Sequence, residues 1–334
     1  MDKNSERVGI TSTIPVEIIY AAGKIPVDVN NVFIGSQNPS SLVRLAKREG
    51  FPDTTCSWIC GLYGAIVERE IGTVICVTGG DCSETIGLME VLSLRGVNVI
   101  PFSYPYNRDA SALRGEIDRL ARHFGVDSKQ AELQKERLDR VRVGIHRLDR
   151  LLWEEDRAFG GEVQLLQLGS SDFEGDPEAY LENVERKIGQ VGARQPIPTE
   201  LRLGFVGVPP IISDLYPSIE RDGVRIVLSE VQRQFSLPGG GDIVEAFIRY
   251  TYPYGIFARA EDIALEIERR RIDGIIHYIQ AFCFRGIEDI ALRRSLKVPV
   301  LTLQGDLPSR VTETMRLRIE AFVDMLRRRK ERSR

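Results

Sequence analysis

The segment Phe51–Leu92 carries four of the five cysteines of the chain and is the strongest indicator of its fold. It begins F-P-D-T-T-C-S-W-I-C-G-L-Y-G, and its second half contains T-V-I-C-V-T-G-G-D-C-S-E-T-I-G-L (Thr73–Leu88). The apolar run Thr73–Thr78 predicts a buried strand, and a helix is expected to follow over Ser83–Arg95. Turns that lead from a strand into a helix are where open α/β sheets bind ligands. The segment therefore predicts an α/β fold with thiols at the ligand-binding edge of a sheet.

The positions of these cysteines indicate different roles. A helix over Cys56–Glu70 would place Cys56 and Cys60 on one face near its N-terminus, which we expect to lower the thiol pKa. Cys82 lies in the G-G-D-C-S turn, beside polar residues. Cys76 lies inside the apolar strand, where cysteine commonly acts as a small apolar side chain. We interpret Cys56 and Cys82 as ligands and Cys76 as core, and Cys60 fits either role.

The composition is that of an ordinary globular protein. A length of 334 residues suggests two domains, and 43% hydrophobic residues are enough to form their cores. A net charge of −3 and no recognition motif argue against nucleic acid as a partner. The first residues, M-D-K-N-S-E-R, are not a signal sequence, and no apolar run reaches about 18 residues. We therefore expect a soluble, cytoplasmic protein with no membrane partner, whose cysteines serve metal or redox chemistry.

Strand and helix patterns alternate in both halves of the chain, which predicts two wound parallel sheets. The expected strands are Arg7–Thr11, Ile25–Val29, Thr73–Thr78 and Val97–Ile100, then Leu201–Gly207, Val224–Leu228, Gly274–Tyr278 and Val298–Leu303. Between them, a long helix expected over Ser128–Phe159 has apolar residues at helical spacing, and its Arg and Glu residues should form a solvated face. We predict three parts: an N-terminal α/β domain (1–125), a helical connecting segment (126–200) and a C-terminal α/β domain with a closing helix (201–334).

Cys283 follows a strand of the second unit, at the same kind of strand end as Cys82. One cysteine from the second unit and two from the first would clamp a cluster between the domains. Three thiolates suit an iron–sulfur cluster in which one iron keeps an open position. Zinc is disfavoured because its structural sites usually have close ligand pairs and this chain has no C-x-x-C. His277 is either a donor close to such a site or a hydrogen-bonded core histidine.

Several segments resemble the 2-hydroxyacyl-CoA dehydratase and benzoyl-CoA reductase family, in particular its cluster-carrying subunits. They occur in the family's order over nearly the whole chain: P-V-E-I-I-Y-A-A-G-K-I-P-V (Pro15–Val27), the C-S-W region (Cys56–Gly64), G-D-C-S-E-T (Gly80–Thr85), D-G-I-I-H (Asp273–His277) through Cys283, V-P-V-L-T-L-Q-G-D (Val298–Asp306) and R-L-R-I-E-A-F-V-D-M-L (Arg316–Leu326).

This resemblance implies a [4Fe-4S] cluster held between two α/β domains by Cys56, Cys82 and Cys283. It also implies a separate ATP-hydrolysing iron–sulfur activator, and a homodimer or a heterodimer with a homologous subunit. The implied reaction passes a low-potential electron to an acyl-CoA substrate, which then loses water. Some relatives instead carry an [8Fe-9S] double-cubane cluster and reduce small molecules. A non-catalytic electron-transfer or cluster-maturation subunit is a further alternative, because no residue pattern identifies a CoA site.

Carboxylates near these motifs are candidates for proton transfer. We name Glu17, on the first helix, and Glu84, beside the Cys82 turn, as candidate catalytic residues. Asp81 also flanks Cys82, and exposed carboxylates beside a turn are commonly just solvated. The glycine-rich loop Ser236–Asp242 either covers a substrate or is an ordinary flexible loop.

Overall fold

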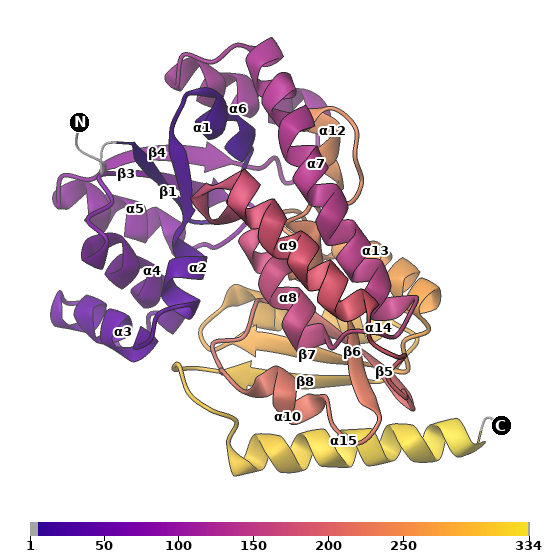
Figure 1. Cartoon of the computed structure of the whole chain (residues 1–334). Coiled ribbons are helices and arrows are strands. Elements are labelled where there is room, and N and C mark those ends of the chain that lie inside the picture. The colour runs from indigo at the N-terminus through magenta and orange to yellow at the C-terminus, as the bar shows by residue number, and fades with distance from the viewer. Residues whose placement is uncertain (1–5, 333–334) are drawn as a thin grey trace.

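The computed structural model describes residues 6–332, which form two α/β lobes on either side of a group of long helices (Figure 1). The first lobe contains a four-stranded parallel sheet in the order β2-β1-β3-β4. The second contains another in the order β6-β5-β7-β8. Both sheets thus place their strands in the same relative order. The predicted α/β class with two wound parallel sheets is confirmed.

The strands are β1 (Arg7–Ile10), β2 (Ile25–Asp28), β3 (Thr73–Gly79), β4 (Asn98–Ser103), β5 (Leu201–Gly207), β6 (Val224–Ser229), β7 (Gly274–Gln280) and β8 (Val300–Gly305). The helices of the first lobe are α1 (Val16–Ala21), α2 (Val29–Ile34), α3 (Pro39–Arg48), α4 (Ser57–Glu68) and α5 (Thr85–Leu94). Those between the sheets are α6 (Ala110–His123), α7 (Ser128–Trp153), α8 (Gly160–Gly169), the 3₁₀ turn η1 (Phe173–Gly175) and α9 (Pro177–Gly192). The second lobe adds α10 (Leu215–Ile219), α11 (Glu230–Gln234), α12 (Ile243–Arg249), α13 (Ile256–Arg270), η2 (Phe284–Glu288), α14 (Asp289–Ser295) and α15 (Glu313–Arg332).

The central helix α7 begins at a capping box and ends before its predicted boundary. The Asp127 carboxylate accepts from the Gln130 N–H, and the Gln130 side chain accepts from the Asp127 N–H. The chain leaves the helix after Trp153, and Asp156 then takes a left-handed conformation with φ of 55°. The long helix predicted from its apolar periodicity is thus present, but it stops six residues short of Phe159 because this turn redirects the chain toward α8.

The predicted solvated face of α7 is wrong at Arg142, and Lys135 of the same helix is buried as well. Arg142 is 2% exposed and Lys135 is 4% exposed. Arg142 donates to the Glu17 carboxylate of α1 at 2.6 Å, and Lys135 contacts Asp139 one turn further along α7. The reason is that α7 packs against α1 as well as α9, so more than one of its faces is covered.

The largest hydrophobic core belongs to the first lobe but is completed by a later part of the chain. Ile243 and Phe247 of α12, with Tyr250 after it, are buried in the same cluster as β1, β3, α6 and α7. The Tyr104 and Tyr250 rings pack edge-on at 6.1 Å. A second cluster lies under α3 and α4, and two more cover the second sheet. The division at residues 125 and 200 stays a prediction. Helix α12 comes after residue 200 in the sequence, yet it packs in the core of the first lobe.

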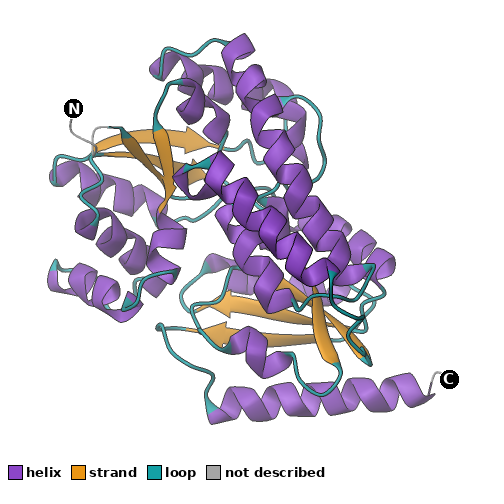
Figure 2. Cartoon of the chain, in the orientation of Figure 1, coloured by secondary structure: helices purple, strands orange, loops and turns teal. Residues whose placement is uncertain are grey.

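Figure 2 shows helices around both sheets, with α15 running along the outer side of the second lobe. Between residues 6 and 332, no helix combines the length and apolar character that crossing a membrane requires.

Candidate functional site

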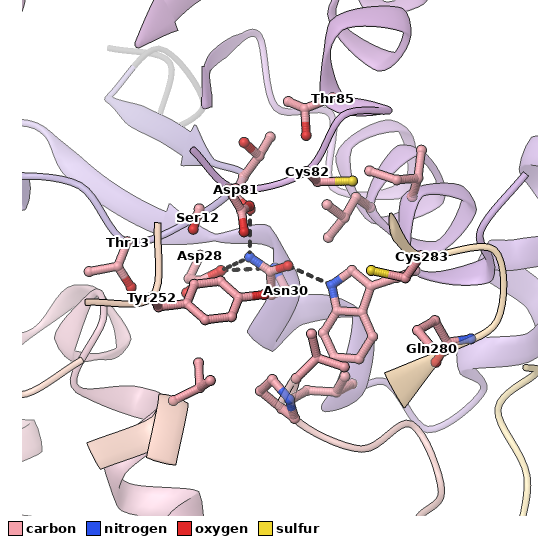
Figure 3. A pocket seen from close by; sticks show the side chains of 18 of the residues that line it. Ser12, Thr13, Asp28, Asn30, Asp81, Cys82, Thr85, Tyr252, Gln280 and Cys283 are labelled. Atoms are coloured by element: carbon pink, nitrogen blue, oxygen red, sulfur yellow. Dashed lines mark hydrogen bonds between the residues drawn. The ribbon is translucent and has the colours of Figure 1, made fainter. Parts of the chain in front are cut away.

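A pocket lies where the carboxyl ends of the two sheets face each other (Figure 3). Its lining comes from the ends of β1, β2 and β3 in the first lobe and of β5, β6 and β7 in the second. This is the edge at which open α/β sheets bind ligands. The polar and cysteine residues of the lining are Thr11, Ser12, Thr13, Asp28, Asn30, Asn31, Cys56, Asp81, Cys82, Thr85, Tyr252, Gln280, Cys283 and Arg285.

Three of the five cysteines line this pocket, although they lie far apart in the sequence. Cys56 immediately precedes α4, Cys82 lies in the turn between β3 and α5, and Cys283 lies in the turn between β7 and η2. Figure 3 shows the Cys82 and Cys283 thiols reaching the pocket from different lobes. The three are near enough to interact, because charge on Cys283 contributes to raising the pKa of both other thiols.

Local backbone structure holds each cysteine in place. The Cys56 N–H donates to the Glu84 carboxylate at 3.2 Å, which ties the start of α4 to the start of α5. Gly80, two residues before Cys82, has φ of 95°, and a Cβ there would lie 2.5 Å from the Pro253 carbonyl oxygen. The turn at Cys82 therefore requires glycine at this position. Phe282, next to Cys283, takes φ of 63° although it is not glycine, a strained conformation of the kind found at functional sites.

Burial governs the protonation of these thiols. It raises the pKa of Cys56 to about 12, and the N–H groups of Trp58 and Ile59 at the start of α4 lower it by less. Burial is also the largest cause of the raised pKa of Cys82 and of Cys283. The start of α4 thus lowers the pKa of Cys56 as expected, but desolvation outweighs this effect, so the thiol pKa is raised overall and not low. Metal ligation is what would offset this cost, since a thiol that binds a metal is deprotonated outright.

Arg285 joins the two cysteine turns. One terminal nitrogen of its guanidinium donates to the carbonyl oxygens of Gly80 and Tyr252, each at 3.0 Å, and to that of Asp81 at 3.4 Å. The other donates to Glu288, and the guanidinium carbon lies 4.3 Å from the Tyr252 ring centre. Arg285 is 5% exposed, so these contacts fix the Cys82 turn of the first lobe against the Cys283 turn of the second.

The carboxylates beside Cys82 are not exposed as expected. Asp81 and Glu84 are both half-buried, and Glu84 is held by the Cys56 N–H. Burial raises the pKa of Asp81 to about 6, opposed by the nearby charge of Arg285 and by hydrogen bonding to Ser12. Asp81 lines the pocket whereas Glu84 does not, and a proton-transfer role for Glu84 stays a prediction.

Glu17, the other candidate catalytic residue, is not brought to the pocket. It is 0% exposed, and its carboxylate pairs with Arg142 in the core between α1 and α7. It is therefore not a solvated carboxylate, and the lining of the pocket does not include it. A catalytic role for Glu17 stays a prediction, and in that role Glu17 would have to act on the pocket from a distance.

Two cysteines and one histidine lie away from the pocket. Cys60 and Cys76 are each 0% exposed and belong to the core under α3 and α4. His277 is 1% exposed and its Nδ1 lies 2.7 Å from the Asp289 carboxylate, so it is a hydrogen-bonded histidine of the second lobe. The loop Ser236–Asp242 is also absent from the lining, and its first residue contacts His146 of α7 through the carbonyl oxygen at 2.9 Å.

The three thiols of the pocket are ligands of the kind that hold iron–sulfur clusters. Among residues 6–332, no three His, Cys, Asp or Glu side chains converge closely enough to hold one metal ion. In a cubane cluster each thiolate binds a different iron, so the thiols surround a group of atoms and do not converge on a point. Three soft thiols also differ from the oxygen ligands that hard cations prefer.

Sequence reasoning missed three residues that shape this site. Asn30 donates through Nδ2 to the Thr11 carbonyl oxygen and accepts from Trp58 Nε1 at 2.7 Å. Arg285 and Tyr252 form the bridge described above. The position of Arg285 two residues after Cys283 is the one signal that could have identified it.

Fold and site together define a class of protein: two parallel α/β lobes with a cysteine-lined pocket between their sheets. A family model described as 2-hydroxyglutaryl-CoA dehydratase, D-component, matches residues 11–326. The chain belongs to this family, as its sequence motifs predicted. The match includes all three pocket cysteines and every strand of the two sheets except β1, which ends at Ile10. A search of curated proteins finds no match.

Proposed function

We propose that this subunit of the 2-hydroxyacyl-CoA dehydratase type binds a [4Fe-4S] cluster through Cys56, Cys82 and Cys283 and passes low-potential electrons to an acyl-CoA. The observation that carries this proposal is the sorting of the cysteines. Three of them reach one pocket from separate turns, whereas Cys60 and Cys76 are fully buried in the core. A structural need for small apolar side chains does not explain why the three from separate turns meet.

The cluster, when bound, would supply the electron and a Lewis-acidic iron. The chain's own residues would exclude water and orient the substrate. Apolar side chains such as Trp58 and Leu62 line the pocket, and the Ser12 and Thr13 hydroxyls face it in Figure 3. Arg285 would hold the two cysteine turns at a fixed separation. Its positive charge would also stabilise the more negative, reduced state of the site.

A wider cleft adjoins the pocket and supports a route for the CoA arm. The two share Asp28, Asn31 and Leu168 in their linings. The cleft also carries the exposed Arg7 and Arg69, together with three acidic residues. Guanidinium groups bind phosphate well, and CoA is rich in phosphate. The acyl end would then enter the pocket while the nucleotide end stays in the cleft.

Partners follow from the same proposal. An ATP-hydrolysing iron–sulfur activator would deliver the electron, and the subunit would work as a homodimer or with a homologous subunit. A double-cubane cluster is less well supported, because Cys60 and Cys76 lie in the core and not in the lining. A pure electron carrier or a maturation protein needs no apolar pocket for a substrate. The apolar side chains that line this pocket therefore favour a substrate-binding enzyme.

Iron and acid-labile sulfide per chain, measured after anaerobic purification and reconstitution, test the cluster. We expect about four irons per chain, and loss of most of that iron in Cys56→Ala, Cys82→Ala and Cys283→Ala. Cys76→Ala is the matched control, a core cysteine that should keep the iron. About eight irons would favour the double cubane. No iron would overturn the proposal, and retained iron in Cys283→Ala would exclude a site shared by both lobes.

A further inference from the structure

The pocket has an unusual balance of charge for a site that would receive an acidic substrate. Only three residues of its lining carry a formal charge: Asp28, Asp81 and Arg285. Two of the three are acids. A carboxylate that enters such a pocket loses its hydration and needs a cation with free donors to compensate.

Arg285, the single cation of the lining, has few donors to offer. Its terminal nitrogens already donate to the carbonyl oxygens of Gly80, Asp81 and Tyr252 and to the Glu288 carboxylate. Its Nε is buried and has no hydrogen-bond partner among the described residues. Guanidinium binds a carboxylate best through two parallel N–H groups. A second carboxylate could engage Nε alone unless the bridge between the cysteine turns broke.

The two acids cannot compensate either, and one of them is firmly held. Asp28 accepts from the Asn30 backbone and side-chain amides on one oxygen, and from the Ser171 hydroxyl at 2.6 Å on the other. Asp28 is therefore fixed at the wall, and neither acid supplies the positive charge that another buried carboxylate would need.

The remaining wall is largely apolar. Ile34, Trp58, Ile59, Leu168, Val231 and Phe235 come from both lobes and the helical segment between them. Burying an apolar acyl side chain against these groups gains roughly 25 cal/mol per Å² removed from water.

We propose that this pocket selects a CoA thioester whose acyl side chain is uncharged and apolar over one that ends in a carboxylate. The inference rests on the proposed function, since it assigns the pocket to the acyl group. It departs from the substrate in the family description, because a 2-hydroxyglutaryl group ends in a carboxylate.

Two thioesters with the same CoA, thioester and hydroxyl groups separate the cases: 2-hydroxy-4-methylpentanoyl-CoA and 2-hydroxyglutaryl-CoA. The full chain, reconstituted with iron and sulfide, would carry Trp153→Phe so that Trp58 of the lining is the only tryptophan. Quenching of Trp58 fluorescence then gives the dissociation constant of each. We expect the uncharged thioester to bind at least about tenfold tighter.

A charge added to the wall gives the second measurement. Phe235 is half-buried in the lining. Phe235→Arg should reduce the difference between the dissociation constants of the two thioesters, because it supplies a cation with free hydrogen-bond donors. Phe257→Arg adds the same charge at a side chain that is 71% exposed and outside the lining, so the difference should stay unchanged.

Equal or tighter binding of 2-hydroxyglutaryl-CoA to the wild-type pocket would overturn this inference and leave the dehydratase-type function standing. Binding of neither thioester by the reconstituted chain would instead overturn the proposed function itself. An equal effect of Phe235→Arg and Phe257→Arg would show that the selectivity arises outside the pocket, which also overturns the inference.

Discussion

Several buried charged side chains in this protein are held in ion pairs. Arg259 contacts both carboxylate oxygens of Glu230 at 2.9 Å, and neither residue is more than 1% exposed. Arg142 and Glu17 form a second such pair at 2.6 Å. Removing charges from water is costly, and a pair tolerates burial because each charge compensates the other. Replacing one partner of such a pair should therefore lower the free energy of unfolding more than replacing both partners with apolar residues.

Glu17→Gln should lower the free energy of unfolding by about 3 kcal/mol, because it leaves Arg142 buried with only Asp139 as a charged partner. The double variant Glu17→Leu with Arg142→Leu should lose clearly less. Urea unfolding at neutral pH measures both. If Glu17 acts only through this pair, the double variant should keep its iron and bind acyl-CoA. A Glu17→Gln protein as stable as the wild type would rule out the structural role.

The pocket cysteines could be predicted from the sequence because each lies next to a recognisable strand or helix start. The pairing of Glu17 with Arg142 could not, because it joins residues 125 apart and leaves no trace in helical periodicity. Periodicity reports one apolar face, and α7 has more than one covered face. The role of Arg285 could not be predicted for a similar reason, since several of its partners are backbone carbonyl oxygens, which every residue has.

Among the elements, the joint between β2 and η1 is held by two buried acids. The Asp28 N–H donates to Asp172 Oδ2 at 2.6 Å, and the Ser171 hydroxyl donates to Asp28. Burial raises the pKa of Asp28, and it raises the pKa of Asp172 to about 7, helped by the charges of Asp28 and Glu174. The helical segment is thus fixed to the first sheet through two buried acids whose pKa values are both raised.

This joint should make stability fall as the pH rises. The native pKa of Asp172, about 7, lies above the ordinary value of 3.8, so the folded state binds more protons between these values. The contribution of Asp172 to the free energy of unfolding should therefore decrease from about pH 4 to about pH 7, by about 1.4 kcal/mol for each unit of raised pKa. Asp81, with a pKa of about 6, acts in the same direction. Urea unfolding at a series of pH values measures the slope.

Asp172→Asn should flatten this slope, because an amide does not titrate. The free energy of unfolding of the variant should therefore rise relative to that of the wild type as the pH rises. Asp53→Asn is the control, since the side chain of Asp53 is fully exposed and the slope should not change. An unchanged slope in Asp172→Asn would contradict the assignment of the pH dependence to this joint.

The elements differ in how far the sequence predicts them. Both sheets follow from apolar runs bounded by turn residues. Short helices such as α8 do not, because α8 begins with two glycines, which are poor helix formers. Glycine is nevertheless required there, since a Cβ on Gly160 would lie 2.4 Å from the Ile226 carbonyl oxygen of β6. Close packing against a sheet has overridden helix propensity at this position.

At the scale of the whole molecule, the site exists only when both lobes are present. Cys283 and Arg285 come from the second lobe, and Cys56 and Cys82 from the first. The main core is shared in the same way, because α12 and the residues after it complete the cluster around β1 and α7. The separation of two cysteine turns is thus set by a single continuous body of packing and not by a flexible linker.

The chain should therefore unfold in one transition, although its length and its two sheets would allow two. Separate melting of the lobes would expose Phe247 and Tyr250, which are at most 2% exposed, and would break the Arg285 bridge. Differential scanning calorimetry should give one peak whose van't Hoff and calorimetric enthalpies agree. Two resolved peaks would show that residues 201–334 form an independent domain, and the pocket would then depend on how two separate bodies dock. The isolated fragment 201–334 provides the check, since without the first core to bury α12 it should show no cooperative transition of its own.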